Sequence, residues 1–324
     1  MNRDRLPLWI SPAEDEPAHG ILLRLAERNG IQTQTMMQTL TGLTVSRLRE
    51  SDGVQVLADI IHSDPSSILC STPTVDAQGH LSIRGERIGR KCDVRLSARR
   101  LCTHCIEESL HHRFWFDLEF VTTCPRHGLE LISSCSCGGH LSWNDVSIIR
   151  CCHCTCGDVR LLKAVPANCD VVEMDRWALG RLGVGDVTFI PALDQMPLKQ
   201  SIDTIGQIGA LDIGGYRQQW VEASDLEVPA FEVRARGFQI LKHSRLDGVL
   251  DLIYGEFVRS GNRSTPTIHT AYGWFGHWFE FVKPSNFSEE ISEIVMANAS
   301  RKFDVKRKAF HALPYASYPI SSAI

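Results

Sequence analysis

The sequence has 324 residues, a length that predicts about two or three domains. With 43% hydrophobic and 22% charged residues, its composition is that of an ordinary globular protein, which excludes a disordered tail or a fibre. The 34 basic and 38 acidic residues give a net charge of −4 with histidine neutral. A uniformly basic surface that coats polyanions is therefore excluded, and any contact with nucleic acid must come from a local patch.

The sequence also bears on the compartment. It contains no run of about 18 or more apolar residues that would cross a membrane. The N-terminal stretch MNRDRLPLWISPAEDE lacks the apolar core of a secretory signal. We therefore expect a cytoplasmic protein with no membrane partner, in a reducing compartment where thiols do not persist as disulfides.

Three short helices are predicted within residues 1–66. The first carries the spacing of one buried helix face at Ala18, Ile21, Leu22, Leu25 and Ala26. Thr33 is the expected cap of a second helix that stops at Gly42, and Asp52 that of a third, which Pro65 closes. Short helices joined by small turns predict a helix-turn-helix-like N-terminal unit.

Residues 67–101 change character and are predicted to be a basic polar linker. Between residues 84 and 100, seven basic residues stand against two acidic ones, a local charge of 7 − 2 = +5. The basic residues are Arg84, Arg87, Arg90, Lys91, Arg95, Arg99 and Arg100. Because the planar guanidinium suits phosphate, this run predicts a contact with the nucleic-acid backbone. The alternative is a merely solvated face.

Nine of the twelve cysteines fall between Cys102 and Cys156. In a reducing compartment, clustered thiols indicate metal ligands. The first set combines a C-x-x-C pair with a C-x-x-H pair, at Cys102, Cys105, Cys124 and His127. Two short pairs on two turns can converge on one ion, and Zn²⁺ suits three thiolates and one imidazole in a tetrahedral site.

The second set offers more thiols than one ion needs. We favour Cys135, Cys137, Cys154 and Cys156 as its ligands. Gly157 follows the last of these, where the chain often turns through a positive φ. Cys151 and Cys152 are the alternates, and we expect His140 and His153 to be surface residues.

The two ligand sets predict two structural zinc ions within residues 102–160. This region has few apolar periodic segments, so metal binding would contribute directly to its folding free energy. Both sets are complete without water, which argues against a zinc hydrolase. The sequence contains no nucleotide-binding or hydrolase motif either, so we do not expect an enzyme.

Helical periodicity returns in residues 161–324. Helices are expected near 170–183, from Pro197 onward and over 246–257. The aromatic-rich stretch STPTIHTAYGWFGHWFEFVKP at 264–284 is apolar on several sides, which is typical of a buried helix and not of a base-stacking surface. The expected fold is therefore mainly α, with a helix-turn-helix-like N-terminal unit, tandem zinc fingers in small β and loop modules, and a C-terminal helical domain.

The cysteine-rich segment CTHCIEESLHHRFWFDLEFVTTCPRHGLELISSCSCGGHLSW resembles the centre of TniQ-family proteins. The matching positions are Cys102, Cys105, Trp115, Cys124, Pro125, His127, Gly128, Leu131, Cys135 and Cys137. The stretch DEPAHGILLRLAERNG at 15–30 is similar to the family's opening segment. The resemblance covers about residues 6–300. In this sequence the second finger has C-x-C where C-x-x-C is commoner in the family.

The resemblance implies a non-enzymatic adaptor for target selection in DNA transposition. Such an adaptor binds target DNA, or a target-bound complex that can be a CRISPR RNA-guided surveillance complex. It recruits an AAA+ ATPase regulator that engages the transposase, and a homodimer is a further candidate assembly. The alternative is a zinc-containing transcription regulator whose N-terminal helices read DNA. A zinc enzyme ranks third, because the ligand sets are closed.

Overall fold

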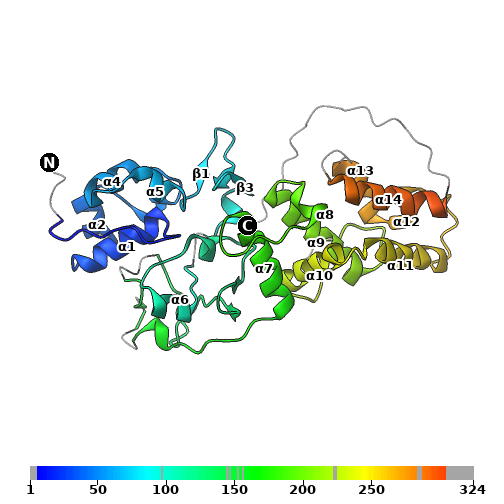
Figure 1. Cartoon of the computed structure of the whole chain (residues 1–324). Helices are drawn as coiled ribbons and strands as arrows, with labels where there is room; N and C mark the ends of the chain where they lie inside the picture. The colour runs from blue at the N-terminus through cyan, green and yellow to red at the C-terminus, as the bar shows by residue number, and fades with distance from the viewer. Residues whose placement is uncertain are drawn as a thin grey trace.

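The computed structural model describes residues 6–95, 98–143, 145, 147–151, 153–154, 157–221, 225–282 and 287–303. Within these residues the fold is mainly helical, with fourteen α-helices and five short strands. Figure 1 shows the N-terminal helices at one end, the cysteine-rich region in the middle and the last helices at the other end. Among the described helices, none has the length and apolar character needed to span a membrane.

The N-terminal unit has five helices where three were expected. They are α1 (Ala18–Arg28), α2 (Gln34–Thr41), α3 (Val45–Leu48), α4 (Val54–Ile61) and α5 (Pro65–Leu69). The apolar face predicted for α1 is buried along its whole length. Thr33 caps α2 by accepting a hydrogen bond from the Met36 amide, and Gly42 ends it in the left-handed conformation. These two helices are thus fixed by local signals that the sequence displays.

Two local expectations for this unit were wrong. Asp52 does not cap α4, whose N-cap is Gly53 with a φ of 90°. The Asp52 carboxylate instead pairs with Arg47 at the end of α3. Pro65 does not close a helix but opens the next one, α5, with Asp64 as its cap. Proline fits the first turn of a helix as well as the segment after one. Whether Pro65 ends one helix or begins the next therefore depended on α5 forming directly after it.

Residues 67–101, expected as a linker, contain a small antiparallel sheet. Its strands are β1 (Thr74–Val75), β2 (Leu81–Ile83) and β3 (Glu86–Gly89), in the order β1-β2-β3. Leu81 and Ile83 are buried on either side of the half-buried Ser82, and Ile88 is buried next to the exposed Arg87, with Gly89 buried after it. The period of two residues is that of a half-buried sheet, and the short 3₁₀ helix η1 (Lys91–Asp93) follows it.

The cysteine-rich middle has little regular structure. It contains α6 (Thr103–Glu108), the 3₁₀ helices η2 (Phe114–Asp117) and η3 (Val159–Leu161), and a hairpin of β4 (Thr123–Cys124) and β5 (Leu129–Glu130). A few isolated bridges, such as that of Leu101 with Ile132, pair further backbone segments. Strands of two residues are not stable alone, so this region depends on interactions beyond its backbone ladder.

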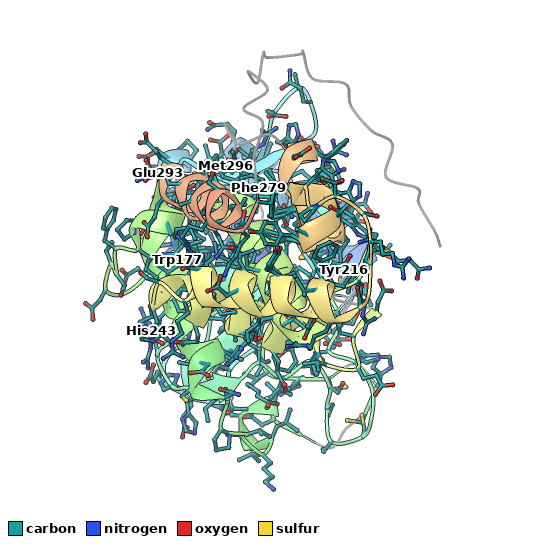
Figure 2. The ribbon with its side chains drawn as sticks, turned by 90° about the vertical axis from the view of Figure 1, so that its right-hand side faces the viewer. Trp177, Tyr216, His243, Phe279, Glu293 and Met296 are labelled. Carbon is teal, nitrogen blue, oxygen red and sulfur yellow. The ribbon has the colours of Figure 1, made fainter. Side chains whose placement is uncertain are left out.

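Eight helices form the C-terminal end: α7 (Cys169–Arg181), α8 (Pro191–Asp194), α9 (Leu198–Gly214), α10 (Ala230–Lys242), α11 (Leu246–Arg259), α12 (Ile268–Tyr272), α13 (Trp274–Val282) and α14 (Glu289–Lys302). In Figure 2, α11 crosses below α13 and α14. Tyr272, Phe275 and Phe279 have no exposed surface. The prediction that the aromatic-rich segment packs in the core is confirmed for these rings and for Trp274 and Trp278, whereas Phe281 is exposed.

Helices α9 and α10 pack closely because glycine faces the partner backbone on both sides. A Cβ atom on Gly209 would lie 1.8 Å from the Val233 carbonyl oxygen, and one on Gly237 would lie 1.9 Å from the Ile205 carbonyl oxygen. No side chain fits at either position. The two glycines therefore set the separation of the helices that support the rest of the C-terminal end.

A buried carboxylate joins the hairpin to the C-terminal helices. Asp175 of α7 accepts hydrogen bonds from the Thr122 and Thr123 amides and from the Thr123 hydroxyl, at 2.8–3.0 Å. Burial raises the pKa of this carboxyl to about 6. Its three donors all belong to the segment that leads into β4, so α7 holds the start of the hairpin in place.

A second buried cluster joins α1 to the cysteine-rich middle. The Nε2 atoms of His19 and His112 lie 2.9 Å and 3.0 Å from the two carboxylate oxygens of Asp117. Burial lowers the pKa of His19 to about 4 and lowers that of His112. Burial works to raise the pKa of Asp117, but the two imidazoles outweigh it and hold that pKa well below its usual range. Both imidazoles are therefore neutral donors to one carboxylate at neutral pH.

This cluster predicts a loss of stability in mild acid. The unfolded chain protonates His19 near its usual pKa of 6.5, whereas the folded protein resists protonation until about pH 4. The unfolded state thus binds more protons in that window, and stability falls as the pH drops from 6.5 to 4, by at most about 3 kcal/mol for this group. Besides Asp117, the charges that face it are those of His112 and Arg49.

Urea unfolding at several pH values measures this dependence. His19→Gln keeps a donor toward Asp117 but removes the titration, so its stability should change less between pH 6.5 and 4 than that of the wild type. His243→Gln, at an exposed position, should behave as the wild type. An equal slope in His19→Gln and wild type would contradict the assignment.

Candidate metal centres

The first ligand set is assembled by one helix start and one hairpin. Cys102 is the N-cap residue of α6, and Cys105 lies one turn further along that helix. Cys124 ends β4, and His127 lies in the turn that leads to β5. Gly128 follows with a φ of 62°, a conformation that glycine adopts without strain. The helix start and the hairpin, whose ligands Cys105 and Cys124 are 19 positions apart in the sequence, thus present their side chains to one point.

The distances in this cluster are those of a tetrahedral site. The His127 Nδ1 atom lies 3.5, 3.4 and 3.5 Å from the sulfurs of Cys102, Cys105 and Cys124. The sulfurs of Cys105 and Cys124 are 3.5 Å apart. Zinc bonds of about 2.3 Å to sulfur and 2.0–2.1 Å to nitrogen place tetrahedral ligand atoms about 3.5–3.8 Å apart. The cluster could therefore hold a zinc ion with little rearrangement.

The surroundings also suit a metal. All three cysteines are fully buried. Hydrogen bonds from Cys102 and then Cys105 lower the pKa of the Cys124 thiol. The pKa values of the Cys102 and Cys105 thiols are raised, so without an ion the negative charge lies on one sulfur of the three. The other nitrogen of His127, Nε2, lies 2.8 Å from a carboxylate oxygen of Glu108. A carboxylate that holds the far side of an imidazole is the usual support of a ligating histidine.

The second cluster is formed by Cys135, Cys137, Cys151 and Cys154. The sulfurs of Cys135 and Cys154 are 3.7 Å apart, and those of Cys137 and Cys151 are 3.9 Å apart. Backbone amides of Gly139 and His153 donate to the sulfurs of Cys137 and Cys151, which stabilises negative charge on those sulfurs. This cluster too could hold a zinc ion.

Cys154 differs from its neighbours in this cluster. It is disulfide-bonded, whereas Cys135, Cys137 and Cys151 are free thiols. Ligation requires a thiolate, so a metal ion at the second cluster requires this disulfide to be reduced. A reducing compartment favours that state.

Seven of the eight predicted ligands lie within the described residues. The four residues of the first set lie together. Of the second set, Cys135, Cys137 and Cys154 lie together, and the alternate Cys151 joins them. Cys156 and the other alternate, Cys152, lie outside the described residues. His140 and His153 are exposed, as expected. Sequence spacing could not choose between Cys151 and Cys156, because the intervening turns decide which thiols converge.

Four of the seven predicted DNA-contacting residues bond to other residues of the chain. Arg99 and Arg100 are buried. Arg100 donates to three backbone carbonyls of residues 116–121, and Arg99 lies 3.5 Å from the Asp145 carboxylate. Arg84 pairs with Asp15, and Arg95 pairs with Glu119. Burial makes Arg99 and Arg100 unavailable to a phosphate in this structure.

The other three basic residues remain on the surface. Arg87 of β3, Arg90 and Lys91 are exposed. Lys91 forms an ion pair with Glu50, while Arg87 and Arg90 have no acidic partner within the described ranges. They lie within five residues of one another, at the end of β3 and the start of η1. We call these three residues the β3–η1 basic patch.

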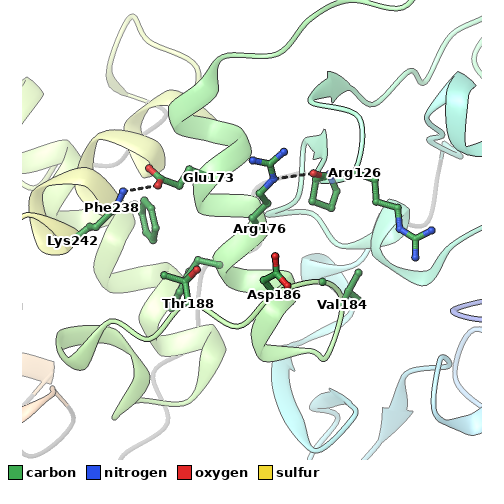
Figure 3. A pocket seen from close by; sticks show the side chains of 11 residues that line it. Arg126, Glu173, Arg176, Val184, Asp186, Thr188, Phe238 and Lys242 are labelled. Carbon is green, nitrogen blue, oxygen red and sulfur yellow. Dashed lines mark hydrogen bonds and ion pairs between the residues drawn. The ribbon is translucent and has the colours of Figure 1, made fainter.

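A pocket of about 520 Å³ lies beside the first cluster. It is lined by Pro125 and Arg126 of the hairpin turn, by α7 and α10, and by the loop after α7. Figure 3 shows Arg176 donating to the Pro125 carbonyl and Lys242 paired with Glu173 across this lining. Its lining comes from separate segments of the chain, so no single sequence motif could have predicted it.

The cluster of His19, His112 and Asp117 was also missed. It has the donor types of a metal site, but His19 and Asp117 lie 98 positions apart in the sequence. The positive charges of Arg49 and Arg99 act on these imidazoles, and the cluster is buried. A divalent cation there would face like charges without access to water. Hydrogen bonding explains the cluster better than metal binding.

Comparison with known proteins agrees with this arrangement. The TniQ family model matches residues 7–131, a span that includes the N-terminal helices, the β1–β3 sheet and all four residues of the first cluster. No curated protein matches the chain. The match confirms the resemblance seen in the sequence over residues 7–131 and associates this part of the chain with DNA transposition. Residues 7–131 of the chain thus carry a TniQ domain.

Proposed function

We propose that this protein is a non-enzymatic adaptor that selects targets in DNA transposition. The observation that carries the proposal is the TniQ match over residues 7–131, which ends just after a four-ligand cluster with tetrahedral spacing. In this role the protein binds its partners and changes no covalent bond. Its zinc sites would be closed by four protein ligands each, which leaves no position for a catalytic water.

The proposed cofactor is two structural Zn²⁺ ions, one in each cluster. The hairpin of β4 and β5 and the loops around it have little backbone pairing. Binding energy from structural zinc is folding energy in such a region. The ions would fix the position of the middle region between the two helical ends, in a reducing cytoplasm that keeps the thiols available.

The proposed contact with target DNA uses the β3–η1 basic patch, Arg87, Arg90 and Lys91. Charge on a flat exposed strand end suits the phosphate backbone and carries no sequence information. The helix-turn-helix-like unit of residues 1–66 would supply any groove contact. Sequence specificity can instead come from a target-bound complex, including an RNA-guided CRISPR complex.

The proposed protein partner is an AAA+ ATPase regulator of the transposase, with a homodimer as a further assembly. The C-terminal helices of residues 161–324 are the candidate surface for such contacts. The division into units 1–66, 67–101, 102–160 and 161–324 is part of this proposal. Limited proteolysis of the zinc-loaded chain would test its boundaries.

Loss of one ligand should release one ion. In Cys105→Ser, purified under reducing conditions, we expect the zinc content to fall from about two to about one per chain, since structural sites need four ligands. The hairpin should also lose protection in hydrogen exchange. Elemental analysis after dialysis measures the zinc. Cys169→Ser, at an exposed thiol outside both clusters, is the matched control and should keep both ions. Two ions retained in Cys105→Ser would disprove ligation by this residue.

Neutralising the β3–η1 basic patch should weaken DNA binding in a salt-dependent way. For Arg87→Gln/Arg90→Gln, we expect the slope of log K against log salt to become shallower by about 2, as for two lost phosphate contacts. Fluorescence anisotropy with duplex DNA at several salt concentrations gives the slope. Arg259→Gln/Arg263→Gln, also exposed, is the charge-matched control. Equal slopes in both double variants would remove the patch from the DNA contact.

The adaptor role itself predicts a ternary complex. The zinc-loaded protein should retain an AAA+ regulator from the same mobile element on target DNA, in co-sedimentation with and without ATP. Deleting its gene should abolish targeted insertion in a transposition assay. Binding to promoter DNA with no effect on the regulator or on insertion would favour the alternative, a transcription regulator.

A further inference from the structure

Three polar side chains meet on the surface where α12 and α13 join. His269 lies on α12, and His277 and Glu280 lie on α13. The Nδ1 atoms of the two histidines are 2.7 Å apart, and the His269 Nε2 atom contacts the Glu280 carboxylate. The imidazole rings are nearly perpendicular, at 84°. The two Nδ1 atoms thus face each other at hydrogen-bonding distance, an interaction that a shared ion would replace. A carboxylate holds the His269 ring from behind.

We propose that His269 and His277 form a third metal site, for a divalent transition-metal ion such as Ni²⁺ or Cu²⁺. Imidazole nitrogen is a preferred ligand of these ions. Two nitrogens bound at about 2.0–2.1 Å would be about 2.8–3.0 Å apart as neighbours in a square-planar or octahedral site, and about 3.3 Å apart in a tetrahedral one. The observed 2.7 Å is closer to the first arrangement, which Ni²⁺ and Cu²⁺ prefer over Zn²⁺.

Glu280 would act as a positioning residue. Its carboxylate accepts the proton of His269 Nε2 and so leaves Nδ1, the atom that faces His277, as the free lone pair. Histidine ligands in proteins commonly have such a carboxylate behind them, and its loss weakens metal binding by about 10–100-fold. The same arrangement, His127 with Glu108, occurs at the first cysteine cluster.

The backbone holds the two histidines at a fixed separation. A Cβ atom on Gly276 would lie 2.1 Å from the Ile268 carbonyl oxygen, so α13 packs directly against the start of α12. Gly273, between the helices, is equally close to the Arg217 carbonyl and has a φ of 58°. A preformed pair costs less to order on binding. His277 is exposed, so water molecules can complete the coordination.

This site would differ chemically from the cysteine clusters. Its donors are imidazoles and water, without thiolate, and it lies at the opposite end of the molecule from the N-terminal helices (Figure 1). An ion there would link α12 to α13 and stabilise the corner at Gly273. The inference does not depend on the proposed role in transposition, since it rests only on these residues.

Calorimetric titration of the untagged, zinc-loaded full chain with Ni²⁺ tests the site. We expect one saturable nickel site per chain, with the zinc content unchanged and the unfolding temperature raised. His277→Ala should abolish this binding. Glu280→Gln should weaken it by about 10-fold or more. His243→Ala, another exposed histidine, should bind as the wild type does.

The result that would overturn the proposal is nickel binding of equal affinity in wild type and His277→Ala, or no saturable site in the wild type. Because the His277 side chain is exposed, its removal should leave the far-UV circular dichroism spectrum unchanged. His269→Ala provides a second variant in the same assay. Absorption bands from thiolate-to-nickel charge transfer would reveal binding at the cysteine clusters instead, which also counts against the site.

Discussion

The structure depends on the convergence of Cys102, Cys105, Cys124 and His127. The hairpin that carries two of these ligands has strands of two residues each, too short to persist through backbone hydrogen bonds. The helix that carries the other two has six residues, too few to be stable alone. Both elements therefore depend on tertiary contacts, and the region supplies buried apolar side chains such as Trp115, Phe116 and Leu118. A shared ion would add to this packing, because metal ligation fixes the two elements directly to each other.

From this centre, two buried polar contacts reach the helical ends. Asp175 holds the chain entering β4 against α7, while Asp117 joins the centre to His19 of α1. Each is a carboxylate whose donors lie in a different part of the chain, and each is fully satisfied on at least one oxygen. Damage at the first cluster would therefore reach both ends of the molecule. The proposed adaptor role would need a middle region that holds the two ends in a fixed relation.

The basic run of residues 84–100 shows the limit of reading charge from a sequence. Its local charge of +5 suggested a phosphate-binding surface, yet Arg99 and Arg100 lie in the interior. Arg100 satisfies backbone carbonyls that the irregular 116–121 segment cannot pair internally. A region without regular structure leaves many carbonyls unpaired, and a guanidinium with five donors can serve several at once. The shortage of strands and helices in the middle region thus explains why arginine side chains are buried there.

Local interactions made the sequence informative about helices and about the first ligand set. The cap at Thr33, the stop at Gly42 and the buried face of α1 all involve residues within a few positions of one another. The C-x-x-C and C-x-x-H pairs likewise define ligands by short spacing. Tertiary structure alone decided which thiols joined Cys135, which arginines were buried, and that His19 and Asp117 would meet across 98 positions. Those outcomes depend on how distant segments pack, and neither periodicity nor spacing records that.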